Sequence, residues 1–235
     1  AAASDNCDSS VTVTYADTTV AGTGNNSVIT RVWTATDDNS NATTYTQTII
    51  VKDNTAPTVV TQAYTLTLGS DGTATLTTAN VDNGTSDNCD SSLTLSLSKT
   101  AFDCTNIGEN TVTLTATDDN SNSASATAVV TVVDTTAPTF TTSPADVTIE
   151  CSASSLPANT GQAAASDNCD SDVTVTYADT TVAGTGNNSV ITRVWTATDD
   201  NSNATTYTQT ITVVDTIAPV ADVTTLTDIT AECSI

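Results

Sequence analysis

Acidic residues recur in this chain in a pattern that could bind metal ions. A Ser-Asp-Asn-Cys-Asp motif occurs at Ser4–Asp8, Ser86–Asp90 and Ser166–Asp170. Each copy is followed by the run Thr-Ala-Thr-Asp-Asp-Asn-Ser-Asn and then by the sequence Asp-x-x-Ala-Pro. Because Ca²⁺ takes about six to eight oxygen ligands from carboxylates, amides and backbone carbonyls, these clusters are candidate calcium sites.

The motifs repeat with a constant period. The prolines of the three Ala-Pro pairs, Pro57, Pro138 and Pro219, lie 81 residues apart, and residues 1–57 are identical to residues 163–219 at 52 of 57 positions. A fixed period of this kind is typical of a tandem array of domains. The sequence therefore predicts four segments: a repeat at 1–57 that lacks its N-terminal strand, a complete divergent repeat at 58–138, a complete repeat at 139–219, and the first strand of a further repeat at 220–235.

Threonine and valine dominate the segments between the motifs, in the alternating pattern of β-strands. Ser27–Thr36 and Thr43–Val51 flank a polar loop and predict a β-hairpin with Trp33 as its core anchor. Gly69–Gly72 predicts a second hairpin between the strands on either side of it. With about seven short strands per repeat and no helical periodicity, the predicted fold is all-β. We expect tandem immunoglobulin-like or fibronectin III-like β-sandwich repeats of 81 residues, joined by short Ala-Pro connections into a rod.

The charge balance excludes several classes of function. The chain has 27 acidic and 4 basic residues, a net charge of −23, and no histidine. Such a charge repels nucleic acids and anionic membranes, and no apolar run is long enough to span a bilayer. Without histidine, Ser-His and Cys-His catalytic pairs cannot form, and carboxylate pairs copied in every repeat are not typical of an active site. We therefore expect no enzyme activity, no nucleic acid partner and no direct membrane insertion.

Strand direction predicts which acidic loops meet when the repeats stack. We expect the Asp-Asp-Asn-Ser-Asn loop at the leading end, where a repeat begins. We expect the cysteine motif at the trailing end, beside the last aspartate. Two sets of calcium ligands would then form: Asp5, Asp8 and Asp53 with Asp118, Asp119, Asn120 and Asn122, and Asp87, Asp90 and Asp134 with Asp199, Asp200, Asn201 and Asn203. The alternative is that these residues only form hairpin turns.

Six cysteines could stabilise repeats whose cores are small. Cys151 and Cys169 are 18 residues apart in one repeat, and Cys89 and Cys104 are 15 apart in another. We expect each pair to form a disulfide, worth about 3 kcal/mol by loop closure, which would place the chain in an oxidising compartment. A zinc site is the alternative, although no Cys-x-x-Cys pair and no histidine supports it.

Cys7 and Cys233 belong to incomplete repeats, so we expect both to pair outside this segment of chain. Asp228–Cys233 parallels Asp146–Cys151, and by homology with the Cys151–Cys169 pair Cys233 complements Cys7. The chain is then either a window of a longer array or the protomer of a filament. In the filament, each chain would add its last strand to the next chain and bond Cys233 to Cys7.

Several runs together resemble a known class of repeat. Asp-Asn-Cys-Asp, Val-Thr-Val-Thr-Tyr, Thr-Arg-Val-Trp-Thr-Ala-Thr-Asp and Val-Val-Asp-Thr-x-Ala-Pro resemble HYR-type (hyalin-repeat-like) immunoglobulin-fold repeats, and Leu97–Cys104 is similar to a second subtype. Such repeats are common in large secreted surface proteins and adhesins of Bacteroidota, so the resemblance implies a secreted or cell-surface protein. It also implies O-glycosylation at Asp-Ser/Thr sequences followed by a small or aliphatic residue; the matching threonines are Thr18, Thr135, Thr180 and Thr216.

These observations predict an extracellular structural or adhesive protein, a disulfide-stapled and calcium-stiffened stalk of an adhesin or fibre. The self-assembling filament is one alternative, and a carbohydrate-binding module is another. The expected partners are neighbouring repeats or identical chains, with surface glycans or proteins as further candidates.

Overall fold

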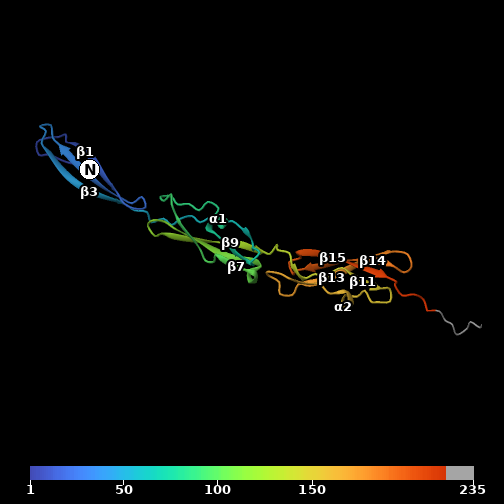
Figure 1. Ribbon diagram of the computed structural model, residues 1–235. Coiled ribbons are helices and arrows are strands. Elements are labelled where there is room, and N and C mark those ends of the chain that lie inside the picture. The colour runs from blue at the N-terminus through green and yellow to red at the C-terminus, as the bar shows by residue number, and fades with distance from the viewer. Residues whose placement is uncertain (221–235) are drawn as a thin grey trace, which may run out of the picture. The chain divides into compact units, whose positions relative to one another are not determined.

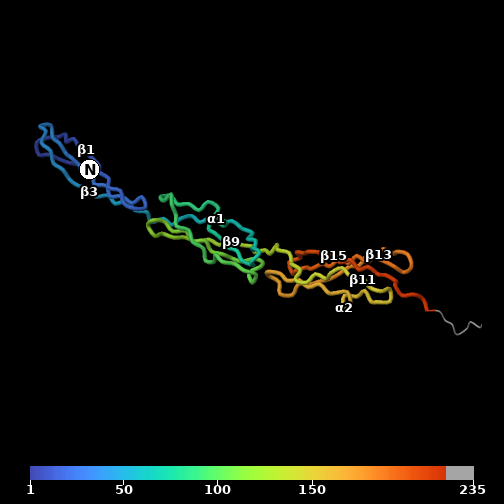
Figure 2. Tube along the Cα trace, viewed as in Figure 1, coloured from blue at the N-terminus to red at the C-terminus, as the bar shows by residue number. Residues whose placement is uncertain are grey.

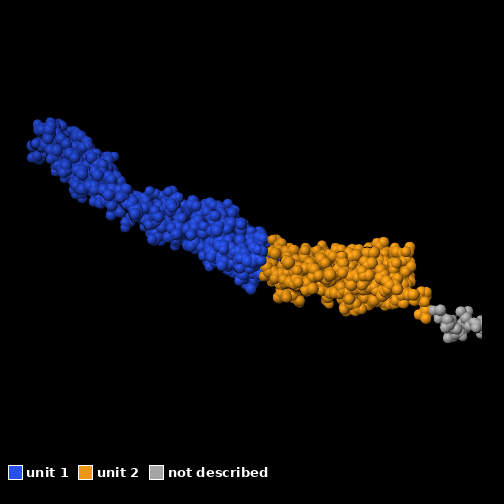
Figure 3. Space-filling view, in the orientation of Figure 1, with its two compact units in different colours: residues 1–134 blue, residues 135–235 orange. Residues whose placement is uncertain are grey.

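A computed structural model describes residues 1–220, and strands dominate it (Figure 1). The chain forms two compact units, Ala1–Asp134 and a second unit that begins at Thr135 (Figure 3). Cys233 and all but the first residue of the expected strand at 220–235 lie outside the described residues. No helix in the described part of the chain is long and apolar enough to cross a membrane.

Residues 1–57 contain a single antiparallel sheet. β1 (Thr12–Ala21), β2 (Ser27–Thr36) and β3 (Ala42–Val51) lie in the order β1-β2-β3, and their Cα trace can be followed in Figure 2. β2 and β3 form the predicted hairpin, in which Trp33 pairs with Tyr45. Because successive side chains of a strand point to opposite faces, Arg31, Trp33 and Ala35 share one face of this sheet.

The remainder of unit 1 is a sandwich of two sheets. The larger sheet has the order β4 (Tyr64–Thr67), β9 (Ser123–Val133), β8 (Gly108–Thr117) and β6 (Thr94–Leu97), with β4 parallel to β9. The smaller sheet pairs β5 (Thr73–Thr75) with β7 (Ala101–Asp103). A helical turn, α1 (Thr78–Val81), follows β5, and a 3₁₀ turn, η1 (Cys104–Asn106), follows β7.

The hairpin predicted around Gly69–Gly72 is wrong, although the turn itself forms. Gly69 N donates to Thr73 O at 2.9 Å, but β4 pairs with β9 whereas β5 pairs with β7. The turn therefore carries the chain from one sheet to the other. This crossing creates an apolar core between the sheets, in which Val112, Leu114 and Val130 are fully buried.

Unit 2 has a larger sheet with the same plan as that of the sandwich in unit 1, but its smaller sheet pairs different strands of the repeat. Its larger sheet has the order β11 (Val147–Glu150), β15 (Ala204–Val214), β14 (Ser189–Thr198) and β13 (Thr174–Ala183), with β11 parallel to β15. Its smaller sheet pairs β10 (Thr139–Thr142) with β12 (Ala164–Ser166), and the helical turn α2 (Pro157–Thr160) lies between β11 and β12 in sequence. The predicted all-β class and the β-sandwich architecture are thus confirmed.

The core of unit 2 contains polar side chains. Trp195 is 2% exposed, and Arg193 and Gln209 are fully buried. Arg193 pairs with Asp179 at 2.7 Å and also donates to Ser155 O at 2.8 Å. These polar groups are stable when buried because each one has hydrogen-bond partners.

Candidate metal centre

In every repeat, the cysteine motif lies beside the Asp-Asp-Asn-Ser-Asn loop. The strand after the motif runs antiparallel to the strand before the loop and begins where that strand ends. The terminal pairs are Thr12 with Thr36, Thr94 with Thr117, and Thr174 with Thr198. The last aspartate of each motif therefore accepts a hydrogen bond from the loop: Asp38 N to Asp8 Oδ2 at 2.8 Å, Asp119 N to Asp90 Oδ2 at 2.9 Å, and Asp200 N to Asp170 Oδ2 at 3.1 Å.

This geometry corrects the predicted position of the cysteine motif. The sequence predicts the motif at the trailing end of its repeat, whereas it lies at the leading end, beside the loop. The prediction treats the strands as one alternating series. In the structure β4 and β9 are parallel neighbours and β5 and β7 form a second sheet, which changes the end at which β6 begins. Consequently Asp5 and Asp8 lie beside the loop that begins at Asp37, and do not join Asp53.

Asp53 instead meets the acidic loops of the following repeat. Carboxylate oxygens of Asp53, Asp87, Asp90 and Asp118 all lie within 4.8 Å of one another. These four residues, here called the Asp53 cluster, come from three loops: after β3, before β6 and after β8. Asp53 and Asp118 are 7% and 5% exposed. Four oxygen donors at this spacing could supply much of the coordination shell of a hard divalent cation.

Two carboxylate oxygens of the Asp53 cluster accept no hydrogen bond and could therefore bind a cation. Asp53 Oδ1 accepts from Thr55 N at 3.0 Å, and Asp87 Oδ1 accepts from Cys89 N at 2.8 Å. The other oxygens, Asp53 Oδ2 and Asp87 Oδ2, are buried and have no hydrogen-bond partner among the described residues. Since a buried charge without a partner is costly, these two oxygens are the strongest indication of a cation.

A turn between β1 and β2 positions Asp53. Asp53 N donates to Asn26 Oδ1 at 2.9 Å, and Asn26 Nδ2 donates to Asn120 Oδ1. Asn120 Nδ2 donates to Gly24 O at 2.9 Å, where Gly24 has a positive φ of 59°. The sequence analysis missed Gly24 and Asn26. Both residues lie in the run Gly-Thr-Gly-Asn-Asn, a composition typical of a turn, but their partner Asn120 is distant in the sequence.

Three further predicted ligands in unit 1 make hydrogen bonds beside the Asp53 cluster. Asn120 and Asn122 use their side-chain amides as donors, and Asn122 Nδ2 contacts Asp118 Oδ2 at 2.8 Å and Asp53 O at 3.4 Å. Asp119 is exposed, and it contributes its backbone N–H to Asp90. Asp119 therefore lies outside the Asp53 cluster, whereas Asn120 and Asn122 lie beside it, and their role as cation ligands stays a prediction.

Unit 2 repeats the arrangement of the two loops. Carboxylate oxygens of Asp167 and Asp199 lie within 4.8 Å of each other. Asp199 accepts from Asn203 N at 2.7 Å, while Asp200 and Asn201 are exposed. The prediction that Asp87 and Asp90 join Asp199 is wrong, because both belong to the Asp53 cluster; Asp134 is the last residue of unit 1.

The Cys89 thiol lies in the negative electrostatic potential of the Asp53 cluster. Its Sγ lies within 4.8 Å of carboxylate oxygens of Asp53 and Asp87. Burial raises the pKa of the Cys89 thiol, and the negative charges of the four aspartates of the cluster raise it further. The neutral thiol is therefore favoured, which makes Cys89 a poor ligand for a soft metal and leaves the aspartate oxygens as the ligand set.

The two predicted disulfides within repeats are wrong. Cys89 and Cys151 are free thiols, as is Cys7, whereas Cys104 and Cys169 are disulfide-bonded. Cys89 precedes β6, beside the end of β8, and Cys104 precedes the start of β8. The 10-residue strand β8 lies between them and is about 30 Å long at about 3.3 Å per residue. This length far exceeds the separation of two cysteines that a disulfide allows. Because the Cys151–Cys169 pair is absent, the proposed homologous pair Cys233–Cys7 loses its basis.

The four threonines that the resemblance implies as glycosylation sites are all exposed to solvent. Thr18 in β1, Thr180 in β13 and Thr135 are exposed. Thr216 is also exposed, and its Oγ1 donates a hydrogen bond to Glu150 Oε1. Glycosylation of these residues stays a prediction.

Comparison with known proteins gives similarity only to solved structures. No family model matches the chain, and no curated protein matches it. Protocadherin gamma B2 extracellular cadherin domains 1–5 are 14% identical, with 88% of this chain and 53% of that chain covered and a TM-score of 0.34. Sidekick-1 immunoglobulin domains 1–4 are 11% identical, with coverages of 87% and 68% and a TM-score of 0.36. Drosophila N-cadherin EC1–3 is 16% identical, with coverages of 80% and 77% and a TM-score of 0.28. The chain spans about half the length of the protocadherin chain it matches.

Proposed function

We propose that this chain is part of an extracellular structural or adhesive repeat protein in which Ca²⁺ binds between the repeat at 1–57 and the repeat at 58–138. The observation that carries the proposal is the pair of buried, unpartnered oxygens, Asp53 Oδ2 and Asp87 Oδ2, within a cluster of four carboxylates. A cation there would compensate the mutual repulsion of the cluster and the cost of burying its charges.

Calcium fits this ligand set better than the other common divalent cations. The donors are carboxylate oxygens, which are hard ligands, and the chain has no histidine. Calcium tolerates irregular geometry with a large coordination number, whereas Mg²⁺ requires a near-ideal octahedron and retains waters. Ligands from three separate loops form an irregular set, which favours calcium.

Calcium would act mechanically at this position. Asp53 follows β3 of one repeat, and its three partners lie in loops of the next repeat. A bound ion would therefore add coordination bonds to the network of Asn26, Asn120 and Asn122 that already joins these segments. The repeats would bend less about the 53–58 connection, which suits a protein that holds a binding region away from a cell. We also propose that the protein is secreted or displayed on a cell surface, that it carries glycans, and that identical chains are among its partners.

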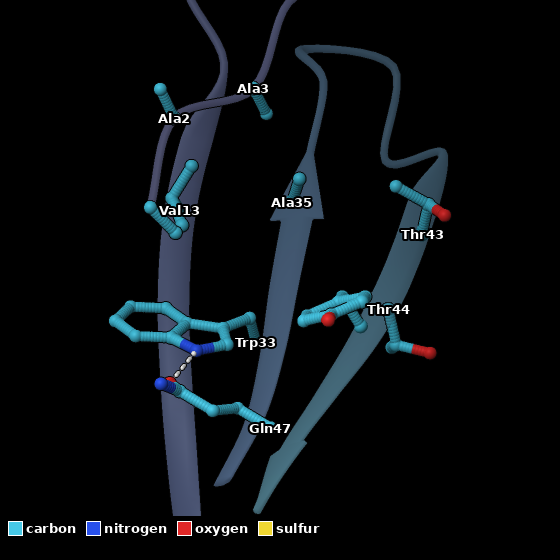
Figure 4. Close-up of a pocket in the computed structure, with 10 residues that line it drawn as sticks. Ala2, Ala3, Val13, Trp33, Ala35, Thr43, Thr44 and Gln47 are labelled. Atoms are coloured by element: carbon cyan, nitrogen blue, oxygen red, sulfur yellow. Dashed lines mark hydrogen bonds between the residues drawn. The ribbon is translucent and has the colours of Figure 1, made fainter.

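A carbohydrate-binding function has weaker support. The exposed Tyr15 and Tyr45 and the half-buried Trp33 (Figure 4) could stack on a sugar, but the same positions in unit 2 include the buried Trp195. These aromatic residues of the first repeat are therefore better explained as core residues that are uncovered.

The test is a calcium titration of the full chain by calorimetry, together with thermal unfolding in calcium, in magnesium and after chelation. Calcium at about 100 times its dissociation constant should stabilise the liganded repeats by about 2.7 kcal/mol, which raises the melting temperature. Asp87→Asn keeps the Oδ1 acceptor of the turn and removes the charge at Oδ2, so this variant should lose the binding event.

Asp5→Asn is the matched control, because Asp5 is the equivalent of Asp87 in the first repeat. Asp5 Oδ1 accepts from Cys7 N at 2.8 Å and from Asp8 N at 3.0 Å, the same turn contacts that Asp87 makes. This variant should bind calcium as the original chain does. Equal losses in both variants, or no calcium-specific change in the original chain, would contradict the proposal.

A further inference from the structure

The loop between α1 and β6 contains the one Asn-Gly pair of the chain, Asn83-Gly84. Both residues are exposed. The three residues before the Ser-Asp-Asn-Cys-Asp motif are Ala-Ala-Ala at 1–3 and at 163–165, but Asn-Gly-Thr at 83–85. Among the three copies, the middle repeat therefore has a carboxamide side chain directly before a glycine nitrogen at this position, and the other two do not.

The two groups that can react with each other have no other partner. Among residues 1–220, neither the side-chain amide of Asn83 nor the backbone N–H of Gly84 forms a hydrogen bond. The adjacent N–H groups are occupied, since Asn83 N donates to Val60 O at 2.9 Å and Thr85 N donates to Asp82 Oδ1 at 3.0 Å. Gly84 N is thus a free nucleophile one residue after the carboxamide carbon, Asn83 Cγ.

The conformation of Gly84 leaves room for this nitrogen to react. Its φ is 93°, in the left-handed region that residues with a Cβ rarely adopt. A Cβ built on Gly84 would have no neighbour within 4 Å among the described residues. The backbone nitrogen is therefore neither shielded by a side chain of its own residue nor packed against the rest of the repeat.

We propose that Asn83 is a site of spontaneous deamidation and isomerisation. Gly84 N attacks Asn83 Cγ and forms the new C–N bond of a cyclic imide, a succinimide. The Cγ–Nδ2 bond breaks, and the side-chain nitrogen leaves as ammonia with the proton that Gly84 N loses. Water then hydrolyses one of the two ring carbonyls, which gives either aspartate at position 83 or isoaspartate. In isoaspartate the backbone continues through Cβ and Cγ of the side chain.

Isoaspartate would loosen the attachment of this loop. It adds one methylene group to the backbone between two anchored points. At the first, Asn83 N donates to Val60 O at 2.9 Å; at the second, Ser86 pairs with Thr58 through two hydrogen bonds of 2.7 and 3.1 Å. The spacing of these anchors fits a normal backbone, so the longer backbone disturbs at least one of them.

The same loop holds a ligand of the proposed calcium site. Asp87 follows Ser86 directly, and its buried Oδ2 is one of the two oxygens of the Asp53 cluster without a partner among the described residues. The consequence for calcium rests on the proposed function. A displaced Asp87 would weaken binding, whereas the new carboxylate at position 83 would favour a cation.

The displacement should dominate over the added charge. Groups that orient metal ligands change metal affinity by about 10- to 100-fold when they are lost, whereas an exposed charge is screened by salt. Because the reaction converts each molecule once, the connection between the repeats at 1–57 and 58–138 would loosen as the protein ages.

The first experiment incubates the folded full chain at mildly alkaline pH, where the attacking nitrogen loses its proton more readily, and follows it by peptide mass spectrometry. Enzymatic methylation of isoaspartate identifies that product. The peptide that contains Asn83 should deamidate before any other asparagine peptide. A synthetic peptide of residues 80–88 gives the rate of an unrestrained Asn-Gly pair, and the folded chain should react within about tenfold of it, because exposed loops open at little cost. Asn83→Ala, which introduces the residue of the other copies, should stay unmodified there.

The second experiment separates the aged forms by ion exchange. The isoaspartate form should lose amide hydrogen-exchange protection in residues 58–62, a readout that does not require calcium. In calorimetric titration the same form should bind calcium about tenfold more weakly or worse. Freshly prepared Asn83→Asp adds the charge without lengthening the backbone, so it should keep both the protection and the affinity of the original chain.

Three outcomes would overturn the inference: a folded chain that stays unmodified while the peptide reacts, deamidation that is faster at other asparagines, or an isoaspartate form with unchanged protection in residues 58–62. A fresh original chain that binds no calcium would contradict the proposed function alone. Mass spectrometry and hydrogen exchange test the reaction at Asn83 independently of that result.

Discussion

The repeat at 1–57 and its counterpart at 163–219 form the same sheet but very different cores. In both copies the first two strands have the same register, from Thr12 with Thr36 to Ala21 with Ser27 in one and from Thr174 with Thr198 to Ala183 with Ser189 in the other. Trp195 is nonetheless 2% exposed, whereas Trp33 is half-buried. Sheet formation is thus encoded in these residues themselves, while burial depends on the segment that covers them.

The two copies also differ in the contacts of their cross-strand arginines. Arg31 and Arg193 each pair with an aspartate at 2.7 Å and lie over tyrosine and tryptophan rings. Of the two arginines, only Arg193 has further partners among the described residues: Ser155 O and Thr160 Oγ1, which the segment 139–162 supplies. The cross-strand pair therefore forms within the sheet alone, and it becomes part of a core when acceptors arrive from outside the sheet.

The largest expected difference between the copies concerns their tryptophans. Trp195→Ala should destabilise unit 2 by about 3–5 kcal/mol, because it leaves a large cavity in a closed core. Trp33→Ala should cost about 1 kcal/mol or less, because the side chain is partly in solvent. Amide hydrogen exchange, resolved by peptide, measures both in the full chain. Equal losses of protection would mean that the open face of the first repeat is covered in solution.

A smaller difference is expected at two equivalent glycines. Gly24 and Gly186 both have positive φ, but a Cβ on Gly24 would lie 2.5 Å from Asn120 Nδ2, whereas one on Gly186 would have no neighbour within 4 Å. Gly24→Ala should therefore disturb the hydrogen bonds that position Asp53 and weaken calcium binding about five- to tenfold. Gly186→Ala should carry only the backbone strain and leave calcium affinity unchanged. Calorimetric titration of the two variants measures the difference.

The smallest effect is expected at the ion pair that both copies share. Hydrogen bonds from Arg31 hold the pKa of the Asp17 carboxyl below its ordinary value. A lowered carboxyl pKa stabilises the folded chain above the ordinary pKa, and this stabilisation is lost as pH falls through the lowered value. Arg31→Leu should raise the pKa of Asp17 toward normal, as measured by carboxyl NMR titration. Thermal stability at neutral pH should change little, because the pair is exposed.

Local patterns in the sequence were sufficient for strands and turns. The alternation in 27–36 and 43–51 predicted the β2–β3 hairpin, and the acidic runs predicted the loops that hold Asp87, Asp90 and Asp118. Local patterns could not predict which of these acidic loops come together in space. This depends on which strands are neighbours, and the parallel pairing of β4 with β9 reverses the end at which the cysteine motif lies.

The cysteines show the same limit. Cys89 and Cys104 are close in sequence, but they lie near opposite ends of β8. Sequence separation therefore said nothing about their distance in the fold. Asn26 was missed for the complementary reason, because its partner Asn120 belongs to another repeat.

The divergent core of the middle repeat has a consequence for folding fidelity. Where β14 buries Arg193 and Trp195, β8 buries Val112 and Leu114 in an equivalent position. During synthesis, a β2 strand that entered the middle repeat by mistake would bring Arg31 and Trp33 into a space filled by small aliphatic groups, without acceptors for the guanidinium. The two nearly identical repeats are thus separated in sequence by one that rejects their strands. We therefore expect this ordering to reduce exchange of strands between neighbouring repeats during folding.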